Sequence, residues 1–159
     1  MPTPTYTPLA TLTLSSSAST VTFGSIPNTY KDLVLVIAGT ASAADQLVCR
    51  FNSSTSNYSE VAMLGYSGGA ISYTATANRL SQMALSTSQS VATMQIMDYS
   101  ATDKHKTALY RTSLGGASTY AVAGRWGDTS AITSIYLGLE SAGVTFSSGT
   151  VFSLYGVAG

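Results

Sequence analysis

The feature that most constrains the fold is the stretch 125–159, which holds two alternating apolar runs joined by a short polar link. The first run comprises Ile132, Ile135, Leu137 and Leu139, and the second is Val151–Tyr155. We expect runs of this kind to fray and aggregate unless they are paired within a sheet. The pattern therefore predicts a closing hairpin on which the fold depends.

A natural partner for this hairpin is residues 32–38, the most apolar stretch of the chain. Leu33, Leu35 and Ile37 share one side of an extended strand, and Val34 and Val36 share the other. Apolar residues on both sides of so short a run indicate a central strand that is buried on both faces. The predicted core comprises Leu33, Leu35, Ile37, Trp126, Ile132, Ile135, Leu137, Phe152, Leu154 and Tyr155, with Trp126 near an edge.

The rest of the chain also alternates with a period of two, and no segment longer than about ten residues has helical periodicity. Strands are expected at 9–14, 21–23, 46–52, 58–65, 91–98, 106–114 and 118–126, besides those already given. The run 46–52 and the run 58–65 read as a long hairpin, and 106–126 as a second one around Gly115-Gly116. The fold class is all-β: an antiparallel β-sandwich, jelly-roll-like, with a single domain over 9–159.

Two segments fall outside this pattern. Residues 1–8 hold Pro2, Pro4 and Pro8, and proline has no backbone donor, so the segment is an extended arm that cannot join a central strand. The arm is either a free tail or a contact laid on a neighbouring subunit. Residues 66–90 allow a short helical turn at Leu80, Met83 and Ala84, but their serine and threonine content argues equally for a long surface loop.

Charge is scarce in this chain. Charged residues make up 9% of it, against roughly 25% in typical soluble domains, and the formal net charge is zero. Serine and threonine supply roughly 30% instead. A neutral surface of hydroxyls favours association with other subunits. It argues against nucleic acid, which needs a basic face, and no apolar run is long enough to span a membrane.

The residues that carry chemistry do not form a recognisable site. The one histidine, His105, lies between two lysines near Asp98 and Asp103, and no nucleophile motif marks a serine partner for it. The one cysteine, Cys49, lies in an apolar run and reads as a buried, inert thiol. The acids are scattered without metal-ligand spacing. We therefore expect a non-enzymatic protein with no metal and no cofactor.

Tyrosine is the enriched side chain with recognition potential, since the chain has ten. A tyrosine offers a rigid apolar ring with a polar tip, which suits protein interfaces and sugar rings. Burial of the ring in a β-core, with the hydroxyl at its edge, is the competing interpretation for each one. The candidate contact residues are Tyr66 and Tyr73, together with Pro2, Pro4, Tyr6 and Pro8 of the arm.

Two stretches, one near each end of the chain, carry distinctive motifs. The first runs Phe23-x-x-Ile26-Pro27-x-x-Tyr30-x-Asp32-Leu33-x-Leu35. The second holds Trp126, Ile132, Ile135 and Phe146, and then Gly149-Thr150-Val151-Phe152-Ser153-Leu154-Tyr155-Gly156. Both resemble motifs of small virion proteins of tailed bacteriophages. Together they bracket most of the chain, whereas residues 38–125 carry no such likeness.

This resemblance implies a structural role in the virion on a β-sandwich fold, as a homotrimer and without catalytic residues. With a short arm and no fibre shaft before the domain, it implies a capsid decoration (cement) protein that binds the major capsid protein on the outside of the shell. A tail-fibre or appendage module that contacts host glycans is the alternative.

Overall fold

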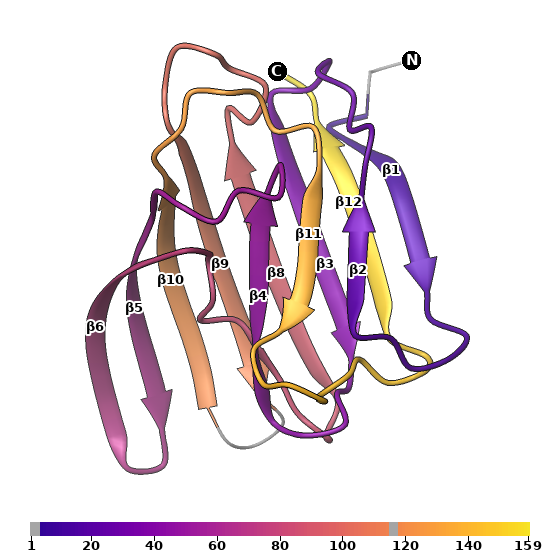
Figure 1. Cartoon of the computed structure of the whole chain (residues 1–159), viewed down its shortest axis with the longest axis vertical. Coiled ribbons are helices and arrows are strands. Elements are labelled where there is room, and N and C mark those ends of the chain that lie inside the picture. The colour runs from indigo at the N-terminus through magenta and orange to yellow at the C-terminus, as the bar shows by residue number, and fades with distance from the viewer. Residues whose placement is uncertain (1–3, 115–117) are drawn as a thin grey trace.

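The computed structural model describes residues 4–114 and 118–159, and within them the chain forms twelve strands and no helix. The strands make an all-β sandwich of two antiparallel sheets, with a four-stranded sheet lying over a larger eight-stranded one (Figure 1). The large sheet has the order β1-β12-β3-β8-β9-β10-β5-β6, and the small sheet β2-β11-β4-β7. Within the described residues, no helix is long and apolar enough to cross a membrane.

The strand bounds follow the alternating pattern closely. The large sheet consists of β1 (Tyr6–Thr13), β12 (Val151–Val157), β3 (Asp32–Gly39), β8 (Ser90–Met97), β9 (Lys106–Leu114), β10 (Ser118–Trp126), β5 (Tyr58–Tyr66) and β6 (Gly69–Ala77). The small sheet consists of β2 (Thr20–Phe23), β11 (Ile135–Leu139), β4 (Asp45–Phe51) and β7 (Ala84–Leu85).

The core lies between the two sheets and contains the expected residues with one exception. Leu33, Leu35 and Ile37 of β3 are fully buried. Phe152 and Leu154 of β12 are buried as well, with at most 1% of their surface exposed. Fully burying a side chain of this size contributes about 1.5–3 kcal/mol. The other predicted core residues are also buried, namely Trp126, Ile132, Ile135 and Leu137. Tyr155 is the exception, because it points to the opposite side of β12 and is half-buried.

The last strand, β12, sits inside the large sheet between β1 and β3. The expected pairing of 151–155 with 32–38 is confirmed, with Leu154 opposite Leu35 and Phe152 opposite Ile37. The expected closing hairpin is wrong, because β11 belongs to the small sheet, where it pairs with β2 and β4. The two apolar runs therefore face each other across the core instead of lying side by side.

The two stretches that carry the virion resemblance pack against each other. The ring of Tyr30 lies so close to Gly156 of β12 that a Cβ at that position would overlap it. Thr150 fills the space beside Gly39 in the same way, and its hydroxyl donates to the carbonyl of Thr40 at 3.0 Å. The glycines at these two positions allow the close approach, so the opening and closing motifs form one structural unit.

An aromatic cluster joins the two sheets. The rings of Tyr58 and Trp126 are stacked at a centroid distance of 6.2 Å, and Phe51 meets Trp126 edge-on at 5.8 Å. Tyr58 belongs to β5 and Phe51 to β4, so the cluster ties the large sheet to the small one. Trp126 is fully buried, with 2% of its surface exposed.

Three segments differ from the expectation. The β1 strand begins at Tyr6, so the last three residues of the expected arm belong to a strand. Pro8 lies within this edge strand, where a missing donor is tolerated. Strands β4 and β5 do not form a hairpin, because the chain crosses from one sheet to the other between them. Residues 66–90 are not one long loop: they contain β6 and β7, and no helical turn forms at Leu80–Ala84.

Candidate interaction surface

The large sheet has one face that the small sheet covers and one that no described element covers, which we call the outer face. Side chains alternate across each strand, so half of every strand points to this outer face. On it, four large apolar side chains are exposed to between 47% and 62%: Val61, Met63, Val91 and Leu109. Val34 and Val36 of β3 also point outward and are half-buried, so the expectation that this strand is buried on both faces is wrong.

The outer face is hollowed across its middle. A depression of about 650 Å³ runs between β3 and β5, floored by β8, β9 and β10, and Tyr6 of β1 contributes to its rim. Its walls include Val34, Val61, Met63 and Leu109. Among the described residues that line it, Arg111 carries the one charge. Contiguous apolar surfaces of this kind are a common feature of interaction sites, among them protein interfaces and ligand-binding grooves.

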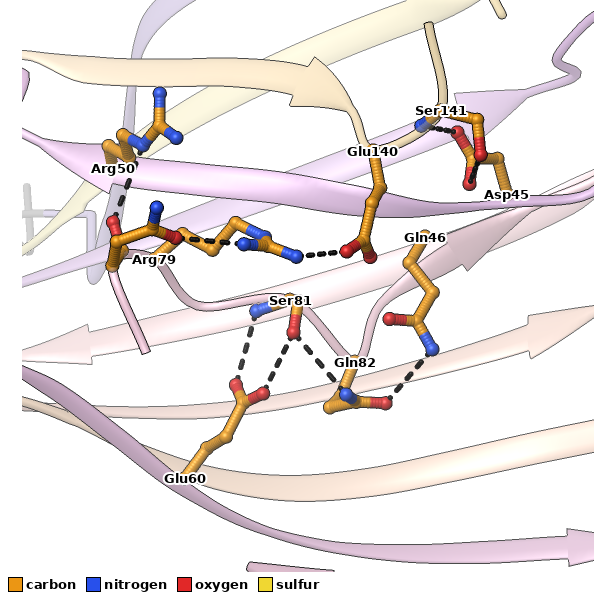
Figure 2. A network of polar contacts seen from close by, with 10 residues as sticks. Asp45, Gln46, Arg50, Glu60, Arg79, Ser81, Gln82, Glu140 and Ser141 are labelled. Atoms are coloured by element: carbon orange, nitrogen blue, oxygen red, sulfur yellow. Dashed lines mark hydrogen bonds and ion pairs between the residues drawn. The ribbon is translucent and has the colours of Figure 1, made fainter. Parts of the chain in front are cut away.

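A second, polar cluster lies on the covered side, where β5 and β6 meet the segment between β6 and β7 (Figure 2). The Glu60 carboxylate is 3% exposed and accepts hydrogen bonds from the Ser81 backbone N–H at 3.1 Å and the Ser81 hydroxyl at 2.8 Å. The Tyr110 hydroxyl donates to the same carboxylate. Burial, reinforced by this neighbouring carboxylate, raises the pKa of Tyr110 well above its usual range.

The donors around Glu60 make its burial tolerable, because a buried carboxylate must be hydrogen-bonded. They also hold residues 78–83 in place beneath the hairpin of β5 and β6. Gln82 links Gln46 of β4, at 3.2 Å, to Tyr73 of β6, whose hydroxyl donates to the Gln82 side-chain oxygen. The cluster is saturated by its own members, and its arrangement is that of a structural brace.

A smaller polar hollow of about 220 Å³ lies on the exposed side of the small sheet. Arg79 forms an ion pair with Glu140 there, and the guanidinium of Arg50 lies 5.7 Å from the ring centre of Tyr136 (the arginines and Glu140 are visible in Figure 2). Both interactions are solvent-exposed and contribute at most about 1 kcal/mol each.

The residues considered for catalysis do not form a catalytic arrangement. His105 is exposed, and its Nδ1 lies 2.8 Å from an Arg125 guanidinium nitrogen. Asp98, one of the two acids near it in the sequence, lies 4.0 Å from the Lys104 ammonium. In the described part of the chain, no three metal-ligating side chains gather into a group that could hold an ion.

Cys49 and the buried tyrosines are held in their neutral forms. Cys49 is fully buried on β4, as the sequence predicts, and that burial raises the pKa of its thiol to about 12. Burial likewise raises the pKa of Tyr73 to about 12. Lys106 is also fully buried: its ammonium donates to the carbonyls of Lys104 and Thr129, and desolvation lowers its pKa.

The candidate contact residues are spread over the molecule. Tyr6 and Pro8 lie exposed on β1, Pro4 is exposed just before it, and Pro2 lies outside the described residues. Tyr66 is 45% exposed at the tip of β5. Tyr73 is half-buried and engaged by Gln82, so its hydroxyl is not free for an external ligand.

Of these, Tyr6 lines the hollow of the outer face, whose main contributors sequence reasoning missed. Val61, Met63 and Leu109 each alternate with a buried residue on their strands, so their parity was visible in the sequence. The sequence does not indicate, however, which of the two faces of the sheet a second sheet covers.

Comparison with known proteins shows a likeness in shape alone. No protein-family model and no curated protein matches the chain. Among solved structures, a galectin of Caenorhabditis elegans, LEC-6, aligns over 90% of this chain and 94% of its own, with 10% identity and a TM-score of 0.41. The alginate lyase Aly36B aligns over 92% and 77%, with 10% identity and a TM-score of 0.38. A tetrameric galectin from the sponge Cinachyrella aligns over 87% and 99%, with 10% identity and a TM-score of 0.34. This chain is similar to all three in overall shape only.

Proposed function

We propose that the chain is a structural protein of a bacteriophage virion, a capsid decoration protein that binds the outside of the major capsid shell and stabilises it. The observation that supports this most is the uncovered outer face, which combines exposed apolar side chains with one charged residue in its hollow. A monomer gains nothing from exposing such a surface, whereas a subunit of an assembly buries it.

The composition supports the same proposal. A formal net charge of zero and a hydroxyl-rich surface lower the barrier to close packing of many copies, as a homotrimer and on a shell. Binding through many identical contacts also gains strength from avidity, so each contact can be weak. The two motifs that resemble those of virion proteins meet in space at Tyr30 and Gly156, which supports treating them as one structural unit.

The first test is the location and copy number of the chain in purified particles of a phage that encodes it, by quantitative mass spectrometry and immunogold electron microscopy. Hundreds of copies over the shell are expected. A few dozen copies or fewer at the tail would instead support the receptor-binding alternative, and absence from the particle would refute both.

The second test addresses the surface. Leu109→Asp places a charge in the outer-face hollow and is expected to abolish rebinding to shells stripped of the protein. The matched control is Thr22→Asp, at an exposed position of β2 on the small sheet. If Leu109→Asp binds shells as well as the wild type does while the control behaves normally, the outer face is not the docking surface.

A further inference from the structure

The hairpin of β5 and β6 carries a concentration of exposed apolar groups. Val61, Met63, Tyr66 and Ile71 lie on it, and they are 45–62% exposed. In Figure 1 the hairpin forms one side of the molecule, and its tip extends away from the strands of the small sheet. The first four residues of β6 are accordingly exposed whichever face they point to.

Strand β6 is also an edge strand, and it is unusually open to pairing. It pairs with β5 over nine consecutive residues without a bulge, and β5 is its single neighbour in the sheet. In an antiparallel edge strand, every second residue directs its N–H and C=O away from the neighbour, so a row of backbone groups faces solvent. The sequence of β6, GAISYTATA, has no charge and no proline to discourage another strand.

The opposite edge of the same sheet is protected. Strand β1 contains Pro8, which cannot donate, and its register with β12 shifts between Pro8 and Ala10. Proline and a bulge are the devices that natural proteins use to block edge-to-edge association. Because one edge has both devices and the other has neither, the open edge is a feature of β6 and not of the fold in general.

We propose that β6 pairs antiparallel with β6 of a second copy of this chain, about a two-fold axis at Tyr73, so that the large sheet continues across two subunits. In this register Ser72 lies opposite Thr74 of the second copy, and Ile71 lies opposite Ala75. Each pair joins residues of the same face, because the positions differ by an even number. Hydroxyl pairs such as Ser–Thr stabilise antiparallel neighbours, and no like charges meet.

A second copy is the occupant that β6 fits best, because its own sequence supplies a complementary strand. Pairing β6 with β1 of another copy would bring Pro8 and the bulge into the ladder, which removes a hydrogen bond and disturbs the register. The two-fold contact is isologous and closes on itself. It is independent of what the outer face binds, and in a trimer it would link one trimer to the next.

The proposal is tested by the association state of the purified full chain, measured by sedimentation equilibrium over a range of concentrations. The wild type is expected to show a reversible two-copy step. In the variant Ser72→Lys/Thr74→Lys, each lysine lies opposite a lysine of the other copy, and we expect that step to weaken by about tenfold or more. The matched control is Thr11→Lys/Thr13→Lys, which adds the same charge to β1 and is expected to leave the step unchanged.

A covalent readout separates loss of contact from loss of folding. In Ser72→Cys/Thr74→Cys, mild oxidation is expected to give a disulfide-linked dimer, while the native Cys49 stays buried and unreactive. A wild type that shows no two-copy step, a step that the lysines do not weaken in a folded variant, or cysteines that do not cross-link would overturn the proposal. Outer-face variants such as Leu109→Asp should not affect this step, so its failure is distinct from failure of shell binding.

Discussion

The Tyr58 hydroxyl satisfies backbone groups of β4 that a neighbouring strand would otherwise bond, and removing this hydroxyl tests that role. The N–H and C=O of Cys49 on β4 bond to the backbone of Leu80. At Phe51, two residues further along, β4 has no strand beside it on that edge, and the Tyr58 hydroxyl bonds to the backbone instead. It accepts from the Phe51 N–H at 2.8 Å and lies 3.4 Å from the Phe51 carbonyl.

In Tyr58→Phe the ring is kept and only the hydroxyl is lost. The stack on Trp126 and the contact with Phe51 therefore persist, so the cost comes from the hydrogen bonds. Phe51 is fully buried, and a buried backbone donor without a partner costs about 1–3 kcal/mol. We expect the free energy of unfolding to fall by about 2 kcal/mol, a value within that range.

The same substitution should change the pH dependence of stability. Burial raises the pKa of the Tyr58 hydroxyl above its unfolded value, which is about 10. Above pH 10 the unfolded state then binds fewer protons than the folded state, and the contribution of Tyr58 to stability falls by about 1.4 kcal/mol per pH unit. Phenylalanine has no such proton, so the deficit of the variant should shrink as the pH rises from 10 to 11.

Both effects are measured by urea unfolding, followed by tryptophan fluorescence, at neutral pH and between pH 9.5 and pH 11, about the unfolded pKa of tyrosine. Trp126, the single tryptophan, reports directly on this cluster. The control is Tyr155→Phe, on the half-buried outer side of β12, which is expected to change stability by less than about 0.5 kcal/mol. A Tyr58→Phe variant as stable as this control, or one whose deficit is constant with pH, would refute the ladder argument.

Three further outcomes follow from the buried groups. Glu60→Gln should lower the free energy of unfolding, measured by urea titration, by about 1–3 kcal/mol. The carboxylate accepts three hydrogen bonds, and an amide in its place would turn its nitrogen toward hydrogen-bond donors. Equal stability of variant and wild type would show that the Glu60 cluster does not stabilise the fold. Phe152→Ala should lower the free energy of unfolding, measured by calorimetry or denaturant titration, by about 3–5 kcal/mol. The Phe152 ring is fully buried and packs edge-on against Phe146 at a centroid distance of 5.0 Å. A loss under about 1 kcal/mol would contradict this burial. Cys49 should resist a thiol reagent at pH 8 until denaturant is added, and rapid labelling of the native protein would contradict its burial and raised pKa.

Much of the fold could be predicted because strand parity is a local property of the sequence. Leu33, Leu35 and Ile37 alternate with Val34 and Val36, and the structure divides them between two faces as the period requires. What the pattern could not say is whether a second layer covers the valines. An uncovered face that carries valines has the same local composition as a face buried within the domain, so the pattern alone predicts burial of both sides of β3.

The other misses also have a physical origin. Strand β6 has hydroxyls and alanines at most positions because it is an exposed edge, and such a strand lacks the apolar alternation that marks a covered one. The crossing between β4 and β5 depends on which sheet each strand joins, and the polar loop of residues 53–57 is equally compatible with a hairpin. Glu60 lies at an inward position between Tyr58 and Ala62, and that parity was the one available sign of a buried carboxylate.

The central place of β12 in the large sheet has a consequence during protein synthesis. Strand β1 pairs with β12 alone, and Thr11 and Ser153, which face each other, are 142 positions apart. A ribosome that adds about 5–20 residues per second needs roughly 7–28 s to cover that interval. Until then, β1 has no partner and one edge of β3 is unpaired. The nascent chain therefore completes its large sheet late. A chaperone that protects these strand edges would have most effect on the yield of folded protein during that interval.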